Sequence, residues 1–403
     1  MGLECQIDIL AHDDAPPAAE NQRKNRRSTP MAKKKVTATQ LRKLDRQLVE
    51  LLNERAAAAI ANGELADARG VAAVDQSASA VADPAILQYA VDNNDGPLSA
   101  GAIQAVFREL LSGIRSANKP IRVAYLGPAY TYTHLAAIAH FGQSAELVPV
   151  ATIASIFEEV EQGHTQFGVA PIENSTDGRV ADSLERLGRM NGLSDSAEAP
   201  PIHVQICGEV PLRIHHCLLG RGARSEIRRV CSKPQALSQC RNWLAAHLPG
   251  VKLEPASSTA EAASLAAAEP DTAAIGAEQA AVNHGLSVLA RNIEDNSENV
   301  TRFAVIGAQA AERTGKDKTA LVFEAPHEPG ALADAMAIFK RHRLNLTWIE
   351  SFPIPGARGR YLFFLEFQGH PAELRVKRAI ASLEKKSLRL SLLGSYAEAE
   401  VVG

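Results

Sequence analysis

The stretch Ile121-Arg-Val-Ala-Tyr-Leu126 runs directly into Gly127-Pro-Ala-Tyr-Thr-Tyr-Thr133, and these two segments decide the fold. The first is short and rich in β-forming residues, so it predicts a strand, and the second ends in hydroxyl residues that favour the start of a helix. The same order returns at Phe167-Gly-Val-Ala-Pro-Ile172, which precedes Glu173-Asn-Ser-Thr-Asp-Gly178. Alternation of short strands with helical segments predicts an α/β domain.

This α/β region extends over residues 120–308. It contains neither Gly-x-Gly-x-x-Gly nor Gly-x-x-x-x-Gly-Lys-Ser/Thr, so nucleotide binding is not indicated. No group of His, Cys, Asp and Glu has metal-ligand spacing, and we expect no metal and no cofactor. Further strands are expected near Glu146–Val150, Ile206–Leu212, His215–Leu219, Val251–Leu253, Thr272–Ile275, Leu286–Ala290 and Phe303–Ile306.

A helical pattern precedes this region, over residues 36–119. Apolar residues recur at three- and four-residue spacing in its first and last helices, which predicts an all-α domain. Residues 1–35 are polar and include Lys33-Lys34-Lys35, so we expect a disordered tail, with Met1 and Met31 as alternative translation starts. The apolar positions are Leu41, Leu44, Leu48, Leu51 and Leu52, then Ile103, Val106, Phe107, Leu110, Leu111 and Ile114.

The last block, residues 318–403, predicts the order strand, helix, strand, strand, helix, strand, which is the α+β ferredoxin-like unit. A linker of small and polar residues, 307–318, precedes it. The chain is therefore multidomain, as 403 residues suggest at about 100–200 per domain. The six elements are expected at Thr319–Glu324, Ala331–Arg341, Leu344–Ser351, Arg360–Phe367, Pro371–Lys385 and Leu388–Leu393.

Composition excludes several classes of protein. Hydrophobic residues make up 46% of the chain and charged residues 22%, which are globular proportions. The 43 basic and 46 acidic side chains leave a net charge of −3, so nucleic acid is not an expected partner and small molecules are. No apolar run approaches the ~20 residues of a membrane span, so we expect no membrane contact. Five scattered cysteines suit a reducing compartment, which favours a cytoplasmic protein.

Four polar turns follow expected strands in the α/β region. Each can cap the amino terminus of a helix, a contribution of about 1 kcal/mol. Helix amino termini also carry free N–H groups and partial positive charge, so four together favour a carboxylate-binding cleft outside the strand ends. The adjacent pair His215-His216 cannot face one site from a strand, and we expect a structural or surface role for it. The turns are Gly127–Thr133, Glu173–Gly178, Ser232–Gln235 and Ser257–Thr259.

These turns carry a resemblance to a known family. In order and spacing, four segments resemble the motifs of prephenate dehydratase. The carboxy-terminal block resembles the ACT regulatory domain that follows this enzyme, and the helical block resembles the chorismate mutase domain that precedes it in the bifunctional P-protein. The segments are Val123–Ala137, Pro171–Gly178, Ser232–Cys240 and Asn299–Phe303, with Pro329–Leu332 and Asn345–Ser351 in the ACT-like block.

The resemblance implies a P-protein architecture and a reaction. The domains are a helical mutase-like domain (36–119), a two-lobed α/β catalytic domain similar to a periplasmic binding protein (120–308) and an ACT domain (318–403). The substrate is prephenate, which loses CO2 and water to form phenylpyruvate in phenylalanine synthesis. Loss of the ring carboxylate needs neutral hydroxyls, amides and helix ends around it more than lysines, and a proton donor near the leaving oxygen supplies about 100- to 10,000-fold.

The resemblance also implies roles for individual residues. Thr301 is the essential hydroxyl, and Arg302 is the expected carboxylate ligand because a guanidinium binds that group bidentately. On a regular strand these two face opposite sides, so both reach one cleft only if the backbone is irregular. Glu173 is either an acid or an ion-pair partner. Asn174 and Gln239 complete the catalytic set, and the remaining substrate contacts are Phe303, Thr131, Ser232, Gln235 and Thr259.

The mutase-like block retains little of the charge that its family uses. Arg55 and Asp75 match the family pattern, but alanine or serine stands at four positions where the family has charge, with Arg42 and Arg69 as alternative sources of it if the helices shift. We therefore expect a degenerate mutase domain retained for dimerisation, with a fully bifunctional enzyme as the alternative. The four positions are Ala38, Ala66, Ala78 and Ser79.

The ACT resemblance implies feedback control, with phenylalanine bound between paired carboxy-terminal domains of a homodimer or homotetramer. Family members commonly carry arginine where this chain has Phe352, which is either a packing site or a change in the effector pocket. Arogenate dehydratase and a non-catalytic small-molecule binding protein stay open as alternative functions. The expected effector residues are Gly330, Ala331, Leu332, Asn345, Glu350 and Ser351.

Overall fold

The computed structural model describes residues 37–68, 84–118, 120–188, 203–354 and 360–403. The chain divides into two units, Met1–Asn53 and Glu54–Gly403, each described here by itself. The predicted tail and Asp75 lie outside the described residues. Three helices come first, and they confirm the helical character expected of this part of the chain: α1 (Ala38–Ala68), α2 (Pro84–Asp92) and α3 (Ala100–Asn118).

Helix α1 presents its apolar stripe to solvent. The side chains of Leu41, Leu44, Leu48 and Leu51 are each more than half exposed, at 53%, 57%, 54% and 62%. A row of exposed leucines at helical spacing is unusual for a surface helix that packs on its own chain. The predicted stripe is present, but no described part of this chain covers it.

The first lobe of the α/β region is built on one mixed sheet. Strand order places β11 in the middle, antiparallel to β3 on one side and to β5 on the other, with β1 and β2 beyond β3. These strands agree with the predicted ones to within a few residues. The elements are β1 (Arg122–Leu126), β2 (Glu146–Val150), β3 (Phe167–Asn174), β4 (Gly178–Arg179), β5 (Gln205–Arg213) and β11 (Val300–Gly307), with helices α4 (Tyr132–Phe141), α5 (Ile153–Glu161) and α6 (Ala181–Gly188).

The second lobe is a separate sheet inserted between β5 and β11. The chain enters it after β5 and returns through residues 291–299, so two crossings join the lobes. Its strand order in the described residues is β10-β6-β9-β7-β8. The elements are β6 (Cys217–Gly220), a 3-10 turn (Arg224–Glu226), β7 (Arg229–Ser232), α7 (Pro234–Gln239), α8 (Arg241–His247), β8 (Lys252–Pro255), α9 (Thr259–Ala268), β9 (Thr272–Gly276), α10 (Glu278–His284) and β10 (Ser287–Ala290).

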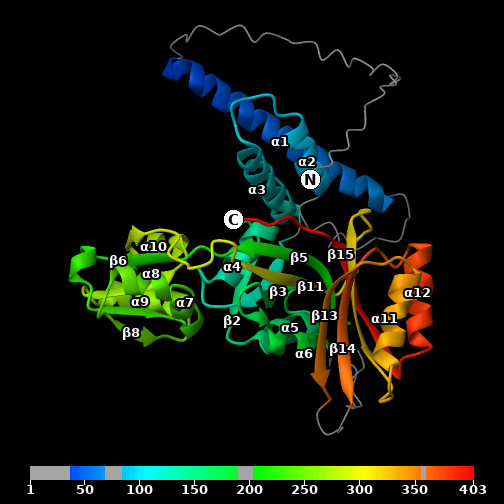
Figure 1. Ribbon diagram of the computed structural model, residues 1–403. Coiled ribbons are helices and arrows are strands. Elements are labelled where there is room, and N and C mark those ends of the chain that lie inside the picture. The colour runs from blue at the N-terminus through cyan, green and yellow to red at the C-terminus, as the bar shows by residue number, and fades with distance from the viewer. Residues whose placement is uncertain (1–36, 69–83, 119, 189–202, 355–359) are drawn as a thin grey trace, which may run out of the picture. The chain divides into compact units, whose positions relative to one another are not determined.

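The carboxy-terminal block has the predicted βαββαβ order. Its strands lie in the order β13-β14-β12-β15, and α11 and α12 cover one face of them (Figure 1). Strand β13 is the edge of this sheet in the part of the chain that the structure describes. The elements are β12 (Asp317–Glu324), α11 (Ala331–Arg341), β13 (Leu346–Pro353), β14 (Tyr361–Gln368), α12 (Leu374–Glu384) and β15 (Arg389–Ala397).

The uncovered face of the carboxy-terminal sheet packs on the first lobe. Strand β15 pairs with β5 at Gly394 and Ile206, so the two sheets are continuous. Gly394 has φ 144°, and a Cβ there would collide with the carbonyl oxygen of Ile206, which is why only glycine fits. Phe352 is buried in the core that the two blocks share, which supports a packing role for it.

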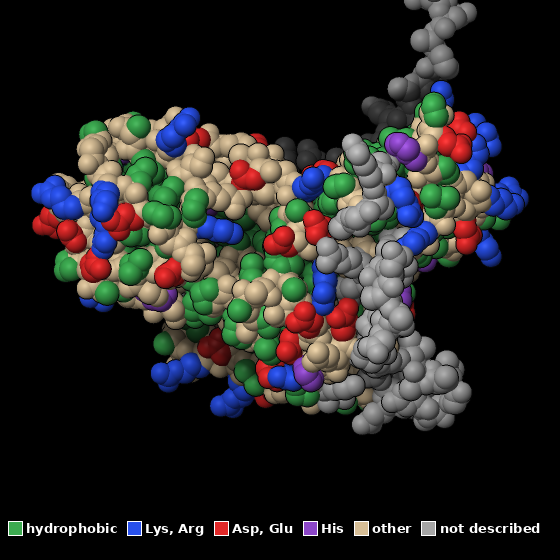
Figure 2. All heavy atoms as spheres, turned by 90° about the horizontal axis from the view of Figure 1, so that it is seen from below, with side chains coloured by type: hydrophobic (Ala, Val, Ile, Leu, Met, Phe, Trp, Pro, Cys, Tyr) green, Lys and Arg blue, Asp and Glu red, His purple; other side chains and the backbone are tan. Residues whose placement is uncertain are grey.

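The surface mixes charges of both signs. Figure 2 shows basic and acidic side chains interspersed over the face it presents, without a large patch of one sign. Among the described residues, no helix combines the length and apolar character needed to cross a membrane.

Candidate active site

The four polar turns of the α/β region converge on one cleft between its two sheets. The cleft has a volume of about 940 Å³. Its wall includes Thr131 from the first turn, Asn174 and Asp177 from the second, Gln235 from the third and Thr259 from the fourth. Ligand sites of open α/β sheets lie at such strand ends, so the expected position of the cleft is observed.

Thr301 stands on the cleft wall with its hydroxyl held by a neighbouring amide. Asn174 Nδ2 donates to Thr301 Oγ1 at 2.8 Å and to Asn299 Oδ1 at 2.9 Å. Asn174 Oδ1 in turn accepts from the backbone N–H groups of Thr176 and Asp177. All the hydrogen-bonding groups of the Asn174 amide are occupied. Because Asn174 donates to the Thr301 oxygen, the hydroxyl proton of Thr301 stays free to donate into the cleft.

A second set of contacts joins the two lobes across the cleft. Gln239 Nε2 donates to Asp177 Oδ2 at 2.8 Å, and Gln235 Nε2 donates to the same oxygen. Gln239 Oε1 accepts from Asn299 Nδ2 at 3.1 Å and lies 2.9 Å from His216 Nε2. That carbonyl oxygen can only accept, so the proton of His216 lies on Nε2. The inter-lobe set is thus continuous with Asn174 and Thr301.

Burial keeps His216 neutral. It lowers the pKa of this imidazole below its ordinary 6.5, and the hydrogen bond to Gln239 and the charge of Glu294 oppose that shift only in part. The Tyr132 hydroxyl lies 2.9 Å from His216 Nδ1, and burial raises the pKa of that phenol well above its ordinary value. The polar wall beside Thr301 therefore carries amides, hydroxyls and a neutral imidazole at pH 7.

Helix amino termini supply positive potential to the cleft. Helix α4 begins there, and its cap Thr131 accepts from the N–H of His134. Helix α9 begins there with Ser258 as its cap, which accepts from the N–H of Glu261. Free N–H groups in these first turns favour an anion. In the described part of the wall the charged side chains are Asp177, Arg179 and Lys233.

Arg302 does not face the cleft, contrary to its predicted role as a carboxylate ligand. Strand β11 alternates regularly through Thr301, Arg302 and Phe303, so the first and third line the cleft and the second points away. The bulge against β3 comes only after Arg302 and does not turn its side chain over. Glu173 also points away and pairs with Arg302 at 2.9 Å, which is the ion-pair alternative left open above.

Ser232 is also not a substrate contact in this structure. Its side chain is fully buried and its hydroxyl donates to the carbonyl oxygen of Ile275 at 2.7 Å, inside the second sheet. Strand β7 ends at Ser232, and its hydroxyl points into the sheet instead of the cleft. The sequence pattern identified the turn correctly but not the direction of this side chain.

Comparison with known proteins identifies the family. The family model for prephenate dehydratase matches residues 123–311. A bifunctional chorismate mutase/prephenate dehydratase from Stutzerimonas stutzeri is 36% identical, over 88% of this chain and 95% of that protein. The chain belongs to the prephenate dehydratase family. Since the match covers nearly the whole length of a bifunctional relative, it is a prephenate dehydratase of the P-protein type.

Solved structures agree with this family. The prephenate dehydratase of Arthrobacter aurescens, in complex with L-Phe, is 34% identical and superposes with a TM-score of 0.62 over 69% of this chain and 90% of that one. A protein described as a quorum-quenching acylase, GqqA, is 27% identical, with a TM-score of 0.61 over 69% of this chain and 98% of that one. The fold alone therefore does not decide the activity, which depends on the residues of the cleft.

Three residues of the dehydratase cleft were missed by sequence reasoning. Asn299 lies two positions before Thr301, and residues two apart share a strand face, so this signal was available. His216 was assigned a structural or surface role because two adjacent histidines cannot share a site. The alternation of side chains along a strand would prevent both histidines from facing the cleft, but one of them can still face it. Asp177 gave no local signal, because its partners Gln235 and Gln239 lie on another lobe.

The predicted effector residues of this P-protein fall into two places. Gly330, with φ 86°, caps α11, on the face of the sheet that the helices cover. Glu350 lies on the opposite face, where Arg179 Nη1 donates to its Oε2 at 2.8 Å. Arg179 also stands over the ring of Phe352, 4.9 Å from its centre. The structure therefore does not bring the Glu350 side chain to the Gly330–Leu332 turn.

The mutase-like region is described only in part. Arg55 on α1 is half-buried. Asp75 and the two expected substitutions at Ala78 and Ser79 lie outside the described residues, and nothing is described of the Ala66 side chain.

Proposed function

We propose that this protein converts prephenate to phenylpyruvate, CO2 and water in the cleft around Thr301. The ring carboxylate leaves as CO2, its electron pair enters the ring, and the ring hydroxyl leaves on the far side of the ring as water. Thr301 Oγ1 donates the proton that this water needs, and its hydroxyl takes a proton back from solvent in the cleft. The observation that carries the proposal is the Asn174 to Thr301 hydrogen bond of 2.8 Å on the cleft wall.

The polar wall suits both ends of this substrate. Helix amino termini at α4 and α9, with Lys233, hold the carboxylate that stays on the product. The neutral amides of Asn174 and Gln239 surround the reacting part without stabilising the carboxylate that must give up its electrons. Phe303 contacts one side of the substrate ring, and the hydroxyl of Thr131 lies beside it. Gln235 and Thr259 contact the substrate from the second lobe.

The test is to incubate the purified full chain separately with prephenate and arogenate, and to follow phenylpyruvate and phenylalanine. Formation of phenylpyruvate, with its loss in Thr301→Ala, supports the proposal. Phenylalanine formed faster from arogenate would assign the protein as an arogenate dehydratase. Binding without turnover of either compound would leave only a small-molecule binding role.

The two lobes are inferred to close over substrate as in a periplasmic binding protein, because two short crossings join them. Asp177 to Gln235 and Gln239 are the contacts that hold the lobes together in this structure. We place the dehydratase domain at residues 120–308, between a mutase-like domain at 36–119 and an ACT domain at 318–403.

The mutase-like region is proposed to serve assembly more than catalysis. Its exposed leucine stripe on α1 is the surface that a second copy of the chain would cover, giving a homodimer. Ala38 and Ala66 stand where the rearrangement needs charge. Loss of chorismate in Thr301→Ala protein measures mutase activity alone, and robust turnover would favour the fully bifunctional alternative.

Phenylalanine is proposed as the effector, bound near Gly330–Leu332 and Asn345 where two carboxy-terminal domains pair. The edge position of β13 in the described part of the sheet supports such pairing, because an edge strand is a ready site for another chain. Ser351 lies on this edge strand, whereas Glu350 is committed to Arg179. Calorimetric titration of the full chain with phenylalanine tests the site.

A further inference from the structure

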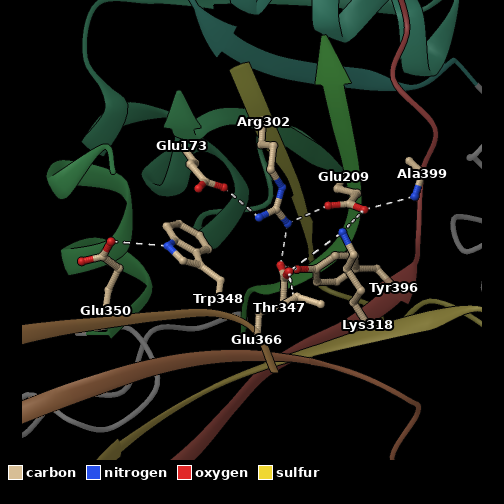
Figure 3. A network of polar contacts seen from close by, with 10 residues as sticks. All are labelled: Glu173, Glu209, Arg302, Lys318, Thr347, Trp348, Glu350, Glu366, Tyr396 and Ala399. Atoms are coloured by element: carbon tan, nitrogen blue, oxygen red, sulfur yellow. Dashed lines mark hydrogen bonds and ion pairs between the residues drawn. The ribbon is translucent and has the colours of Figure 1, made fainter. Parts of the chain in front are cut away.

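Arg302 lies beneath the dehydratase cleft, among three carboxylates (Figure 3). Its Nη1 is 2.9 Å from Glu173 Oε2, and its Nη2 is 2.8 Å from Glu209 Oε2 and 2.6 Å from Glu366 Oε2. The exposed fractions of the Arg302, Glu209 and Glu366 side chains are 16%, 1% and 0%. These contacts occupy both terminal nitrogens of the guanidinium, which leaves Arg302 committed to protein carboxylates.

The partners of Arg302 come from two domains. Glu173 and Glu209 lie on β3 and β5 of the catalytic region, whereas Glu366 lies on β14 of the carboxy-terminal block. The indole of Trp348, on β13, stands 5.5 Å from the guanidinium carbon. Arg302 is thus the point at which the catalytic strand β11 meets the carboxy-terminal sheet.

The residues that the carboxy-terminal block contributes to this cluster also make ion pairs and hydrogen bonds within it. Lys318 Nζ is 2.8 Å from Glu209 Oε1, and the Tyr396 hydroxyl donates to Glu366 Oε2 at 2.6 Å (Figure 3). Thr347 Oγ1 donates to the other oxygen of Glu366 at 2.6 Å. Burial raises the pKa of Glu366, but the charge of Arg302 and these hydrogen bonds outweigh it and hold the pKa below its ordinary value. Glu366 is therefore a charged carboxylate inside the protein.

The ion pair between Arg302 and Glu366 has few arrangements between fully formed and fully separated. Separating Arg302 from Glu366 breaks the shortest ion pair of this largely buried cluster. Arg302 then keeps Glu173 and Glu209, while Glu366 keeps the hydroxyls of Thr347 and Tyr396 and the Lys318 ammonium 3.9 Å away, so the separation weakens the pairing of a buried charge and is unfavourable. The contact is therefore either made or broken as the carboxy-terminal sheet moves. Thr301 is joined to Arg302 by one planar peptide unit, so a shift of the Arg302 backbone displaces Thr301 as well.

We propose that Arg302 is a positioning residue: its ion pair with Glu366 of the carboxy-terminal domain holds Thr301 in the catalytic position, and the effector acts by loosening this contact. The inference rests on the dehydratase function proposed above. An effector that binds the loosened state more tightly than the intact state lowers activity by shifting the population between them. Full activity then depends on a carboxylate that never touches substrate.

The test uses four full-length variants, with kcat, KM for prephenate and inhibition by phenylalanine as readouts. Glu366→Gln keeps the volume of the side chain and one acceptor oxygen, removes the charge and turns the other acceptor into an N–H donor. Arg302→Met removes the guanidinium. Arg302→Lys restores one charge. Arg229→Met is the matched control, since Arg229 is also part-buried and bonded to Glu254 and Thr272, but on the second sheet.

The expected result is a fall in kcat of about tenfold or more in Glu366→Gln and Arg302→Met, with KM within about threefold of wild type. Arg302→Lys recovers part of the kcat, and Arg229→Met changes neither constant. Inhibition by phenylalanine becomes weaker in the first two variants, while calorimetry shows that phenylalanine still binds. If Arg302→Met fails to fold, Glu366→Gln and Arg302→Lys carry the same test.

Two results would overturn the inference. One is a kcat and a phenylalanine response within twofold of wild type in Glu366→Gln. The other is a large rise in KM with kcat unchanged in the Arg302 variants, which would make Arg302 a substrate ligand. Both require a wild-type enzyme that turns prephenate over. A wild type without that activity would instead refute the proposed function.

Discussion

The two faces of strand β11 differ in burial, in charge and in the residues that they contact. On the cleft face, Thr301 is half-buried and its partners are neutral amides. On the other face, one residue later, Arg302 is buried among carboxylates from two domains. A strand alternates its side chains between its faces, so one short motif serves two purposes. Thr301 and Arg302 are adjacent in sequence, but they have different partners and different consequences when they are changed.

Adjacent residues of one sequence motif therefore need not line the same site. Reading Thr301-Arg302-Phe303 as one functional unit assigns all three residues to substrate. The structure separates them because the carboxy-terminal strands β13 and β14 lie against the Arg302 side of β11. We expect variants on the cleft face to change the chemical step, and variants on the other face to act through domain contact.

The largest effect is expected for Thr301→Ala. Removing the hydroxyl removes the proton donor, and we expect kcat to fall by about 100- to 10,000-fold. The melting temperature should stay close to that of wild type, because one half-buried hydroxyl is lost and little volume changes. Thr301→Ser keeps the hydroxyl and is the matched control, with most of the activity retained. A kcat for Thr301→Ala within threefold of wild type would contradict the proton-donor role.

A smaller effect is expected for Asn174→Ala. The Thr301 hydroxyl loses the amide that orients it, and we expect kcat to fall by about 10- to 100-fold. The double variant with Thr301→Ala should be no slower than Thr301→Ala alone, because the group that Asn174 orients is then absent. If the two losses multiply instead, Asn174 acts on substrate independently of Thr301.

The order of the helices and strands and the four polar turns could be predicted from the sequence, because both depend on residues that are close together in the chain. Hydroxyl and amide residues after β-rich runs mark helix starts wherever they occur, and Thr131 and Thr259 lie where this predicts. The roles of Arg302 and Ser232 were wrong for a shared reason. Their side chains point at structures formed by distant segments, Glu366 for the first and Ile275 for the second, and no local pattern shows these contacts.

Acid should disturb the cleft network around His216 and the ion pair of Arg302 with Glu366 in different pH ranges. The pKa of His216 is lowered by burial, so its neutral form stabilises the fold above pH 6.5 and this contribution is lost as the pH falls below that value. The pKa of Glu366 is lowered in spite of burial, so its contribution is present above pH 4.5 and is lost only on further acidification.

Urea unfolding at a series of pH values checks this order. The free energy of unfolding of His216→Gln should vary less than that of wild type just below pH 6.5. Glu366→Gln should match the wild-type slope there and differ from it below pH 4.5. If Glu366→Gln alters the slope in the upper range, its carboxyl group titrates near neutrality and is not held charged by Arg302.

The smallest effect on catalysis is expected for Ser232→Ala. The hydroxyl lies in the core of the second sheet, so its removal should destabilise the protein by about 1 kcal/mol and leave kcat and KM within about twofold of wild type. Chemical unfolding and steady-state kinetics on the same preparation measure both quantities. A tenfold rise in KM would return Ser232 to the substrate site.

The central claim is that substrate meets the Thr301 face of β11 and never reaches Arg302. The most direct test is calorimetric titration of prephenate into Thr301→Ala protein, which cannot turn it over, with and without the further change Arg302→Met. We predict the same dissociation constant within about threefold for both folded proteins, with a lower melting temperature after the Arg302→Met change because buried carboxylates lose their partner. A loss of affinity of about 100-fold on removing the guanidinium, the size expected for a charge-assisted carboxylate contact, would contradict the account.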